Sequence, residues 1–284
     1  MRYLTEYFRP STPQEAVELK RQFGAAAAYL AGGSDLMVSR SESLQAVIDI
    51  RHAGLDTLQR NGNGWTIGGA ALLCDVEDEL KEVAGGMLRE AVRETAPWLI
   101  RNAATLAGNL ANASPAADSV PALLALDAEL TLLGNGEETV PAASVLAGPH
   151  VTTLGDRLIV AVHISSTAAA RYAAFAKHSR SKSDIAQVNM AVALRIDNGI
   201  ARDVRIALGA VAPTAIRARN AEALLEGREL AAAPLQEIQA AVAQEISPIS
   251  DWRASADYRR RAGSVQVRRG LERIMKQAGL GETS

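Results

Sequence analysis

The chain has 284 residues, of which 48% are hydrophobic and 22% charged, a composition typical of a globular protein long enough for about two domains. Its 30 basic and 32 acidic residues give a formal net charge of -2, so there is no basic surplus to neutralise phosphates, and nucleic acid is excluded as a main partner. The single cysteine, Cys74, excludes an internal disulfide and an iron–sulfur cluster held by this chain alone, because a cluster needs several thiolates.

The first predicted helix begins at a capping box. Residues 12–15, Thr-Pro-Gln-Glu, combine a capping hydroxyl, a proline at the first helical position and a glutamate three residues after the cap. They predict a helix through about Phe23. The next predicted elements are strands at 29–30, 46–50 and 65–67, a hairpin turn at 61–64, and helices at 75–80 and 87–96. This order predicts an α/β arrangement for the first part of the chain.

Residues 30–36, Leu-Ala-Gly-Gly-Ser-Asp-Leu, form the first candidate binding segment. Gly32 and Gly33 permit a tight turn, and Ser34 or Asp35 can cap the apolar segment after the turn, which directs backbone N–H groups toward a phosphate. A single Gly-Gly turn is more commonly an ordinary loop. A second segment of small residues in the same chain favours the binding interpretation.

That second segment is residues 105–119, Thr-Leu-Ala-Gly-Asn-Leu-Ala-Asn-Ala-Ser-Pro-Ala-Ala-Asp-Ser. Its small residues and its hydroxyl and amide side chains leave backbone N–H groups open to an anionic ligand that approaches closely. It contains no nucleophile and no set of metal ligands. We therefore predict a site for a phosphate-bearing cofactor, and no catalytic residue in this chain.

The pattern of elements changes towards the C-terminus. A helix is predicted at 120–126 and strands at 128–133 and 157–164, and the alanine-rich stretch 168–174 predicts a hinge. Beyond it we expect a strand pair at 188–196 and 201–211 around Asn198-Gly199, helices at 219–226 and 234–245, and a C-terminal helix. The predicted domains are residues 1–174 and a smaller α+β domain with an antiparallel sheet at 175–284.

The other chemically notable side chains favour structural roles. His52, His150, His163 and His178 lack metal-ligand spacing, so no metal site is predicted. Cys74 follows an apolar run and is interpreted as a small buried residue. The arginines at 259–261, 268, 269 and 273 form either a solvated helix face or a contact with a partner subunit.

A cytoplasmic location is expected for the chain. A lone cysteine suits a reducing compartment, residues 1–6 contain no apolar signal core, and no apolar run reaches the length of a transmembrane helix. The dinucleotide fingerprint Gly-x-Gly-x-x-Gly and the ATP-binding P-loop are also absent, so the cofactor is held in another way.

Taken together, the motifs resemble those of the flavin-bearing medium subunit of the xanthine dehydrogenase, or molybdenum hydroxylase, family, which includes the carbon monoxide dehydrogenase medium subunits. The resemblance rests on residues 31–36, 100–111, 114–118, 175–177, 184–186 and 251–259, which occur in family order across nearly the whole chain. It implies FAD lying between two α/β subdomains, followed by the smaller C-terminal domain. The implied fold class is α+β.

The resemblance also implies which residues bind FAD. The pyrophosphate and ribityl chain are expected near Leu30, Ala31, Gly32, Gly33, Ser34, Asp35 and Leu36, and near Thr105, Leu106, Ala107, Gly108 and Asn109. Asp118 matches an aspartate that contacts FAD, which suits a carboxylate accepting from hydroxyl groups. Ile159 and Lys177 match positions near the flavin ring, where an ammonium stabilises negative charge. The alternative for Lys177 is a surface lysine on a loop.

The chain departs from the family pattern at two positions. Ala107 replaces the first glycine of the usual Gly-Gly-Asn, which is tolerable if its φ is negative. Ser34 stands where some relatives have threonine or histidine, so a histidine-linked flavin is excluded and noncovalent FAD is expected.

The implied function is electron transfer within a larger enzyme. A large subunit with molybdopterin oxidises the substrate, a small subunit with two [2Fe-2S] clusters relays electrons, and this chain passes them from FAD to a final acceptor, in a dimer of heterotrimers. The segment around Trp252, Arg253 and Tyr258 is a candidate for holding that assembly. The alternatives are a self-sufficient flavin oxidase, for which the C-terminal hundred residues are small, and a non-catalytic assembly subunit with a vestigial FAD site.

Overall fold

The structure is a computed structural model that describes residues 4–39 and 43–280. Of the N-terminal residues 1–6 considered above for a signal core, residues 1–3 lie outside the described ranges. Its N-terminal part contains β1 (Glu6–Phe8), α1 (Pro13–Phe23), β2 (Ala27–Leu30), α2 (Leu36–Ser39) and β3 (Ala46–Asp49). The three strands form a parallel sheet in the order β1-β3-β2. The capping box is confirmed in part, because Thr12 Oγ1 accepts from the Glu15 N–H at 3.2 Å, whereas the Glu15 carboxylate accepts from the N–H of Ser11.

The central part is built on a five-stranded antiparallel sheet in the order β4-β5-β10-β6-β7. Its strands are β4 (Leu58–Asn61), β5 (Gly64–Gly68), β6 (Glu129–Leu133), β7 (Glu137–Pro141) and β10 (Leu158–Ile164), and a separate pair consists of β8 (Leu146–Gly148) and β9 (Val151–Thr152). The helices are α3 (Leu73–Glu79), α4 (Met87–Thr95), α5 (Trp98–Arg101), α6 (Leu106–Ala111), α7 (Ser119–Ala125) and α8 (Ser166–Ala169). The hairpin turn predicted at 61–64 is confirmed between β4 and β5.

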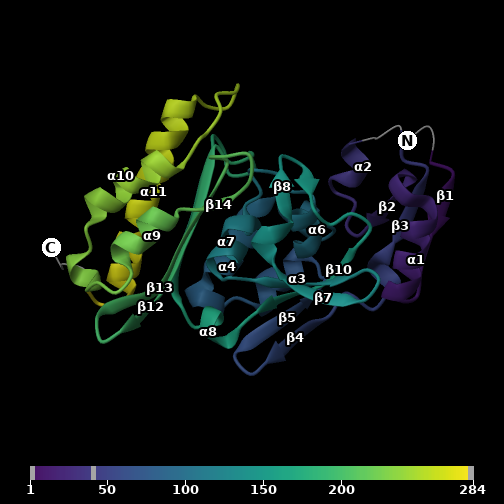
Figure 1. Cartoon of the computed structure of the whole chain (residues 1–284), viewed down its shortest axis with the longest axis horizontal. Helices are drawn as coiled ribbons and strands as arrows, with labels where there is room; N and C mark the ends of the chain where they lie inside the picture. Colours follow the sequence, from purple (N-terminus) through teal and green to yellow (C-terminus); the bar gives the residue numbers. More distant parts are fainter. Residues whose placement is uncertain (1–3, 40–42, 281–284) are drawn as a thin grey trace.

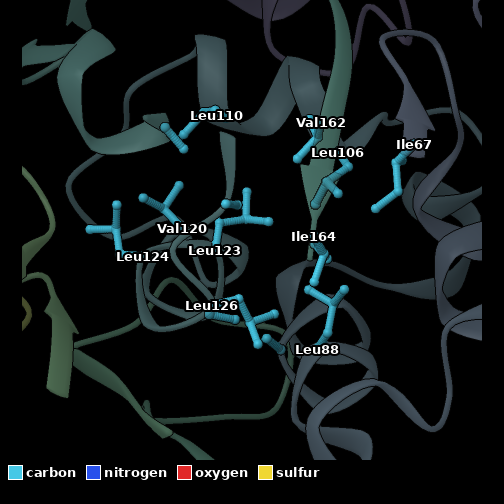
Figure 2. Close-up of a cluster of buried hydrophobic side chains, with 14 of the residues drawn as sticks. Ile67, Leu88, Leu106, Leu110, Val120, Leu123, Leu124, Leu126, Val162 and Ile164 are labelled. Atoms are coloured by element: carbon cyan, nitrogen blue, oxygen red, sulfur yellow. The ribbon is translucent and has the colours of Figure 1, made fainter. Parts of the chain in front are cut away.

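A single apolar cluster fills the space between this sheet and its helices. Figure 2 shows Leu106 and Leu110 of α6 in the same interior as Leu123 of α7 and Val162 of β10. All four side chains are fully buried. Because burying a leucine contributes about 1.5–3 kcal/mol, this packing fixes α6, and with it the loop that leads into the helix.

The C-terminal part is a four-stranded antiparallel sheet in the order β11-β12-β13-β14, packed between two sets of helices. Its elements are β11 (Tyr172–His178), β12 (Val188–Asp197), β13 (Ile200–Gly209), β14 (Ile216–Arg217), α9 (Arg219–Leu225), α10 (Leu235–Glu245) and α11 (Ala256–Gln277). The helices α10 and α11 lie at the end of the molecule farthest from α1, and the central helices α4 and α7 pack against the sheet from the other side (Figure 1). The predicted α+β fold class is confirmed.

Short 3₁₀ helices complete the described elements: η1 (Gly24–Ala26), η2 (Ile50–His52), η3 (Val83–Gly86), η4 (Ala142–Val145) and η5 (Leu230–Ala232).

The structure corrects three expectations. The stretch 168–174 cannot be a hinge over its whole length, because its last residues, Ala173 and Ala174, are buried in β11. Residue 174 lies inside β11, and the division of the chain into domains stays a prediction. Arg259 is not on a solvated face: it is buried, and its Nη1 donates to the carbonyl oxygens of Gln187 and Ala210 at 2.8 and 3.0 Å. Cys74 is half-buried rather than buried, and its thiol donates to Asp75.

Candidate functional site

A cavity of about 580 Å³ lies where the two predicted binding segments meet. Ten of the residues expected at the cofactor line it: Ala31, Gly32, Gly33, Ser34, Asp35, Leu36, Thr105, Gly108, Asn109 and Asp118. Segments that are about 70 residues apart in the sequence therefore form opposite walls of one space. The volume suits a drug-sized or cofactor-sized ligand.

The two walls contact each other directly, and Gly32 makes that contact possible. A Cβ atom on Gly32 would lie 2.0 Å from the carbonyl oxygen of Ala103 and 2.7 Å from the Cα of Ala104. No side chain fits there, so only glycine permits this approach of backbone to backbone. A hydrogen bond from Asn112 Nδ2 to Asp35 Oδ1, of 3.0 Å, ties the same two segments together on the other side.

Local backbone chemistry shapes each wall. Gly33 has φ +70°, a left-handed conformation that favours glycine, and it forms the turn that leads into α2. On the facing wall, Thr105 caps α6 by accepting from the Gly108 N–H at 3.0 Å. Ala107 lies within α6 and is not among the residues with positive φ, so the replacement of the usual glycine causes no backbone strain.

Asp118 forms a buried polar cluster at the wall of the cavity. Its side chain is only 5% exposed, and its Oδ2 lies 2.9 Å from Lys177 Nζ. Its Oδ1 accepts a hydrogen bond of 2.7 Å from Asn189 Nδ2. Burial raises the pKa of Asp118 to about 6, against the lowering effects of the Lys177 ammonium and the Asn189 amide.

Lys177 is not the surface lysine of the alternative interpretation. It lies on β11, its side chain is 4% exposed, and Nζ also donates to the carbonyl oxygen of Glu94 at 2.7 Å. An ammonium has three N–H donors, and these two partners occupy two of them. One donor therefore remains for a further acceptor.

The loop that carries Asp118 is held by the C-terminal sheet. The N–H of Ala210 donates to the Pro115 carbonyl oxygen at 2.6 Å, and Asn189 Nδ2 lies 3.3 Å from the Ala116 carbonyl oxygen. Ala113 and Ala210 have φ +47° and +61°, which non-glycine residues adopt at a cost in energy. Ala113 precedes the loop and Ala210 follows β13, so each of the two contacting segments includes one residue with a strained backbone.

Five of the residues expected at the cofactor do not line the cavity. Leu30, Leu106, Ala107 and Ile159 are buried in the hydrophobic core, and Lys177 reaches the site through Asp118. The cavity also has lining residues that were not named individually as cofactor contacts, among them Tyr29, Ile100, Asn112 and Ile185.

Ile185 is marked in the sequence only as part of a motif, and Asn189 carries no sequence signal for the site. Asn189 lies 71 positions after Asp118 in the sequence, and the packing of α7 against β12 brings the two residues together. No local pattern marks such a pair.

The segment expected to help assembly has a defined surface structure. Trp252 is 69% exposed, and the guanidinium carbons of Arg180 and Arg253 lie 4.7 and 4.5 Å from the centre of its ring. The Tyr258 hydroxyl is hydrogen-bonded to His178 Nε2 at 2.6 Å. The role of this segment in assembly stays a prediction.

Residues 4–39 and 43–280 contain no group of three or more His, Cys, Asp or Glu side chains that could hold a metal ion. His163 instead bridges strands, with its two ring nitrogens hydrogen-bonded to Thr66 and Thr131. None of the helices in this described part of the chain combines the length and apolarity needed to cross a membrane.

Comparison with known proteins covers both parts of the chain. A family model described as the FAD binding domain in molybdopterin dehydrogenase matches residues 3–166. A second, described as the CO dehydrogenase flavoprotein C-terminal domain, matches residues 173–274.

Individual relatives match over nearly their whole length. The carbon monoxide dehydrogenase medium chain of Hydrogenophaga pseudoflava is 30% identical over 273 residues, covering 94% of this chain and 95% of that one. The xanthine dehydrogenase FAD-binding subunit of Escherichia coli O157:H7 is 30% identical over 285 residues, covering 96% and 97%. A solved structure of carbon monoxide dehydrogenase from Hydrogenophaga pseudoflava superposes with a TM-score of 0.91 at 31% identity, covering 96% of this chain and 98% of the other.

Proposed function

Because the chain belongs to the family of FAD-binding medium subunits of carbon monoxide and xanthine dehydrogenases, we propose that it transfers electrons from a partner's [2Fe-2S] clusters to a final acceptor. It is an oxidoreductase subunit with an FAD-binding domain. The direction of electron flow, the partners and the residues that contact FAD are parts of the proposal.

The residues at the cavity fit FAD. Gly32 and Gly33 line the cavity without side chains of their own, so a phosphate can approach the backbone of this turn closely. The Asp118 carboxylate has about four acceptor positions, of which Lys177 and Asn189 use two, so it can also accept from ligand hydroxyl groups. Thr105, Gly108 and Asn109 would hold the facing side.

When bound, FAD supplies redox chemistry, because it accepts electrons singly and gives them up as a pair. The side chains of this chain bind and orient the cofactor. Asp118 anchors its polar portion, and the Lys177 ammonium places a fixed positive charge at a buried position, where electrostatic effects are strong. The core packing of Leu106 and Leu110 keeps the wall rigid.

The partners follow from what this chain does not supply. One cysteine cannot bind an iron–sulfur cluster, and the described residues hold no candidate metal site. We infer a small subunit with [2Fe-2S] clusters and a large subunit with molybdopterin, assembled as a dimer of heterotrimers in the cytoplasm. The related subunits from Hydrogenophaga and Escherichia support this inference.

The observation that carries the proposal is that both glycine-containing segments and Asp118 line one cavity. The test is to purify the chain and measure flavin per chain, and then to add substrate with and without the two partner subunits. We expect close to one FAD per chain, and acceptor reduction only in the full assembly. A chain that binds no flavin would support the assembly-subunit alternative, and turnover of an organic substrate by the isolated chain would support the flavin oxidase.

A further inference from the structure

Asn189 is a buried amide of the C-terminal sheet that contacts the loop lining the cavity. It lies on β12 and is fully buried. Its Nδ2 donates to Asp118 Oδ1 at 2.7 Å and lies 3.3 Å from the Ala116 carbonyl oxygen. Both partners belong to the loop that lines the cavity.

The chemistry of these partners fixes the orientation of the amide. A carboxylate and a carbonyl oxygen both accept hydrogen bonds, so Asn189 must present its NH₂ group to the loop. Its Oδ1 is then buried without a hydrogen-bond partner. Such an atom destabilises a protein, and its presence in a native fold calls for a functional explanation.

The strand opposite is adapted to this arrangement. Gly209 is the register partner of Asn189 across β12 and β13. A Cβ atom at Gly209 would lie 2.2 Å from Asn189 Oδ1 and 3.1 Å from the Pro115 carbonyl oxygen. The glycine gives the amide the room it needs to turn toward the loop.

We propose that Asn189 is a positioning residue that fixes the orientation and the ionised state of Asp118 for FAD binding, so that the C-terminal domain contributes to the cofactor site. This proposal rests on the function proposed above. Asn189 acts through Asp118.

Two charged groups from other elements act on the same carboxylate. The Lys177 ammonium on β11 favours its ionised form, and the Glu94 carboxylate on α4 disfavours it. Burial raises the pKa of Asp118 to about 6. Since the Asn189 amide donates more strongly to the ionised carboxylate than to the neutral acid, losing the amide raises this pKa further.

The test is an FAD titration of the apoprotein between about pH 5 and 8, where the Asp118 carboxylate changes its charge. In the wild-type protein the Kd for FAD should rise as the pH falls through about 6, because a protonated Asp118 is a poorer acceptor. In Asn189→Ala this rise should begin at a higher pH, and the Kd for FAD at pH 7 should be about three- to tenfold higher than in the wild-type protein. Other charged groups at the cavity, such as Asp35, are present in both proteins and cancel in the comparison.

Met190→Ala is the matched control. Met190 is the next residue on β12 and packs into the C-terminal core, near Gly270 on α11. It should lower thermal stability without moving the pH at which FAD affinity falls. Gly209→Ala is a second variant, which keeps Asn189 but displaces its amide, and it should reproduce the pH shift.

A double variant separates positioning from packing. In an Asp118→Ala background, adding Asn189→Ala should change the Kd for FAD very little, because the group it acts through is gone. Equal weakening at every pH, or an undiminished effect in that background, would overturn the proposal while leaving FAD binding intact. Failure of the wild-type protein to bind FAD would instead refute the proposed function.

Discussion

Gly32→Ala should break the contact between the two walls of the cavity at which we propose that FAD binds. The added methyl group would lie 2.0 Å from the Ala103 carbonyl oxygen and 2.6 Å from its carbonyl carbon, both of them backbone atoms. Neither can rotate away as a flexible side chain does. The two segments must therefore separate by roughly 1 Å or more to restore an ordinary contact.

The magnitude follows from the nature of this clash. Overpacking a tight interior typically destabilises a protein by about 1–3 kcal/mol, and a clash with backbone lies at the upper end of that range. The separation would also pull Asp35 away from Asn112, whose hydrogen bond of 3.0 Å joins the same walls. We expect a lower melting temperature and at least about a tenfold loss of FAD affinity, equivalent to about 1.4 kcal/mol.

The assay is flavin per chain after purification, together with a Kd from flavin fluorescence and a thermal melt. Gly136→Ala is the matched control, because nothing lies within 4 Å of its Cβ position and its φ is not positive. It should behave as the wild-type protein does. Gly32→Ala with unchanged flavin content and melting temperature would refute the placement of the two walls.

Two further predictions concern stability and the bond to the cofactor. Burial alone would raise the pKa of Asp251, but hydrogen bonds from the Arg253 N–H and the Arg259 guanidinium prevail and lower it to about 2. The resulting stabilisation is present above the unfolded-state pKa and is lost as the pH falls toward 2. Asp251→Asn should therefore lower the melting temperature at pH 7, and the difference in melting temperature from the wild-type protein should disappear between about pH 4 and 2. A difference that stays constant with pH would contradict this. Because Ser34 offers no histidine for a covalent link, acid precipitation should release the flavin into the supernatant, and yellow colour in the pellet would show a covalent bond.

Local sequence signals predicted some of the elements. The hydroxyl of Thr12 and the adjacent proline placed the start of α1, and Asn198-Gly199 placed the turn between β12 and β13. Each signal acts through neighbours a few residues away, so a single stretch of sequence contains all of it.

The contacts that build the site act over longer distances. The sequence marks Gly32 for its freedom to turn, but its lack of a side chain matters because Ala103 packs against it. Arg259 is expected on a solvated face or at a partner subunit because arginine is mostly exposed, whereas its guanidinium donates to the carbonyl oxygens of Gln187 and Ala210, next to β12 and β13. Such partners become neighbours only when the sheets assemble.

The most direct test of the electron-transfer role is rapid-mixing absorbance of the flavin after substrate is added. The assembled protein, with both partner subunits, should show bleaching of the flavin band, whereas the isolated chain with FAD bound should show none and should still be bleached by an artificial reductant. Bleaching of the isolated chain by an organic substrate would contradict the electron-transfer role.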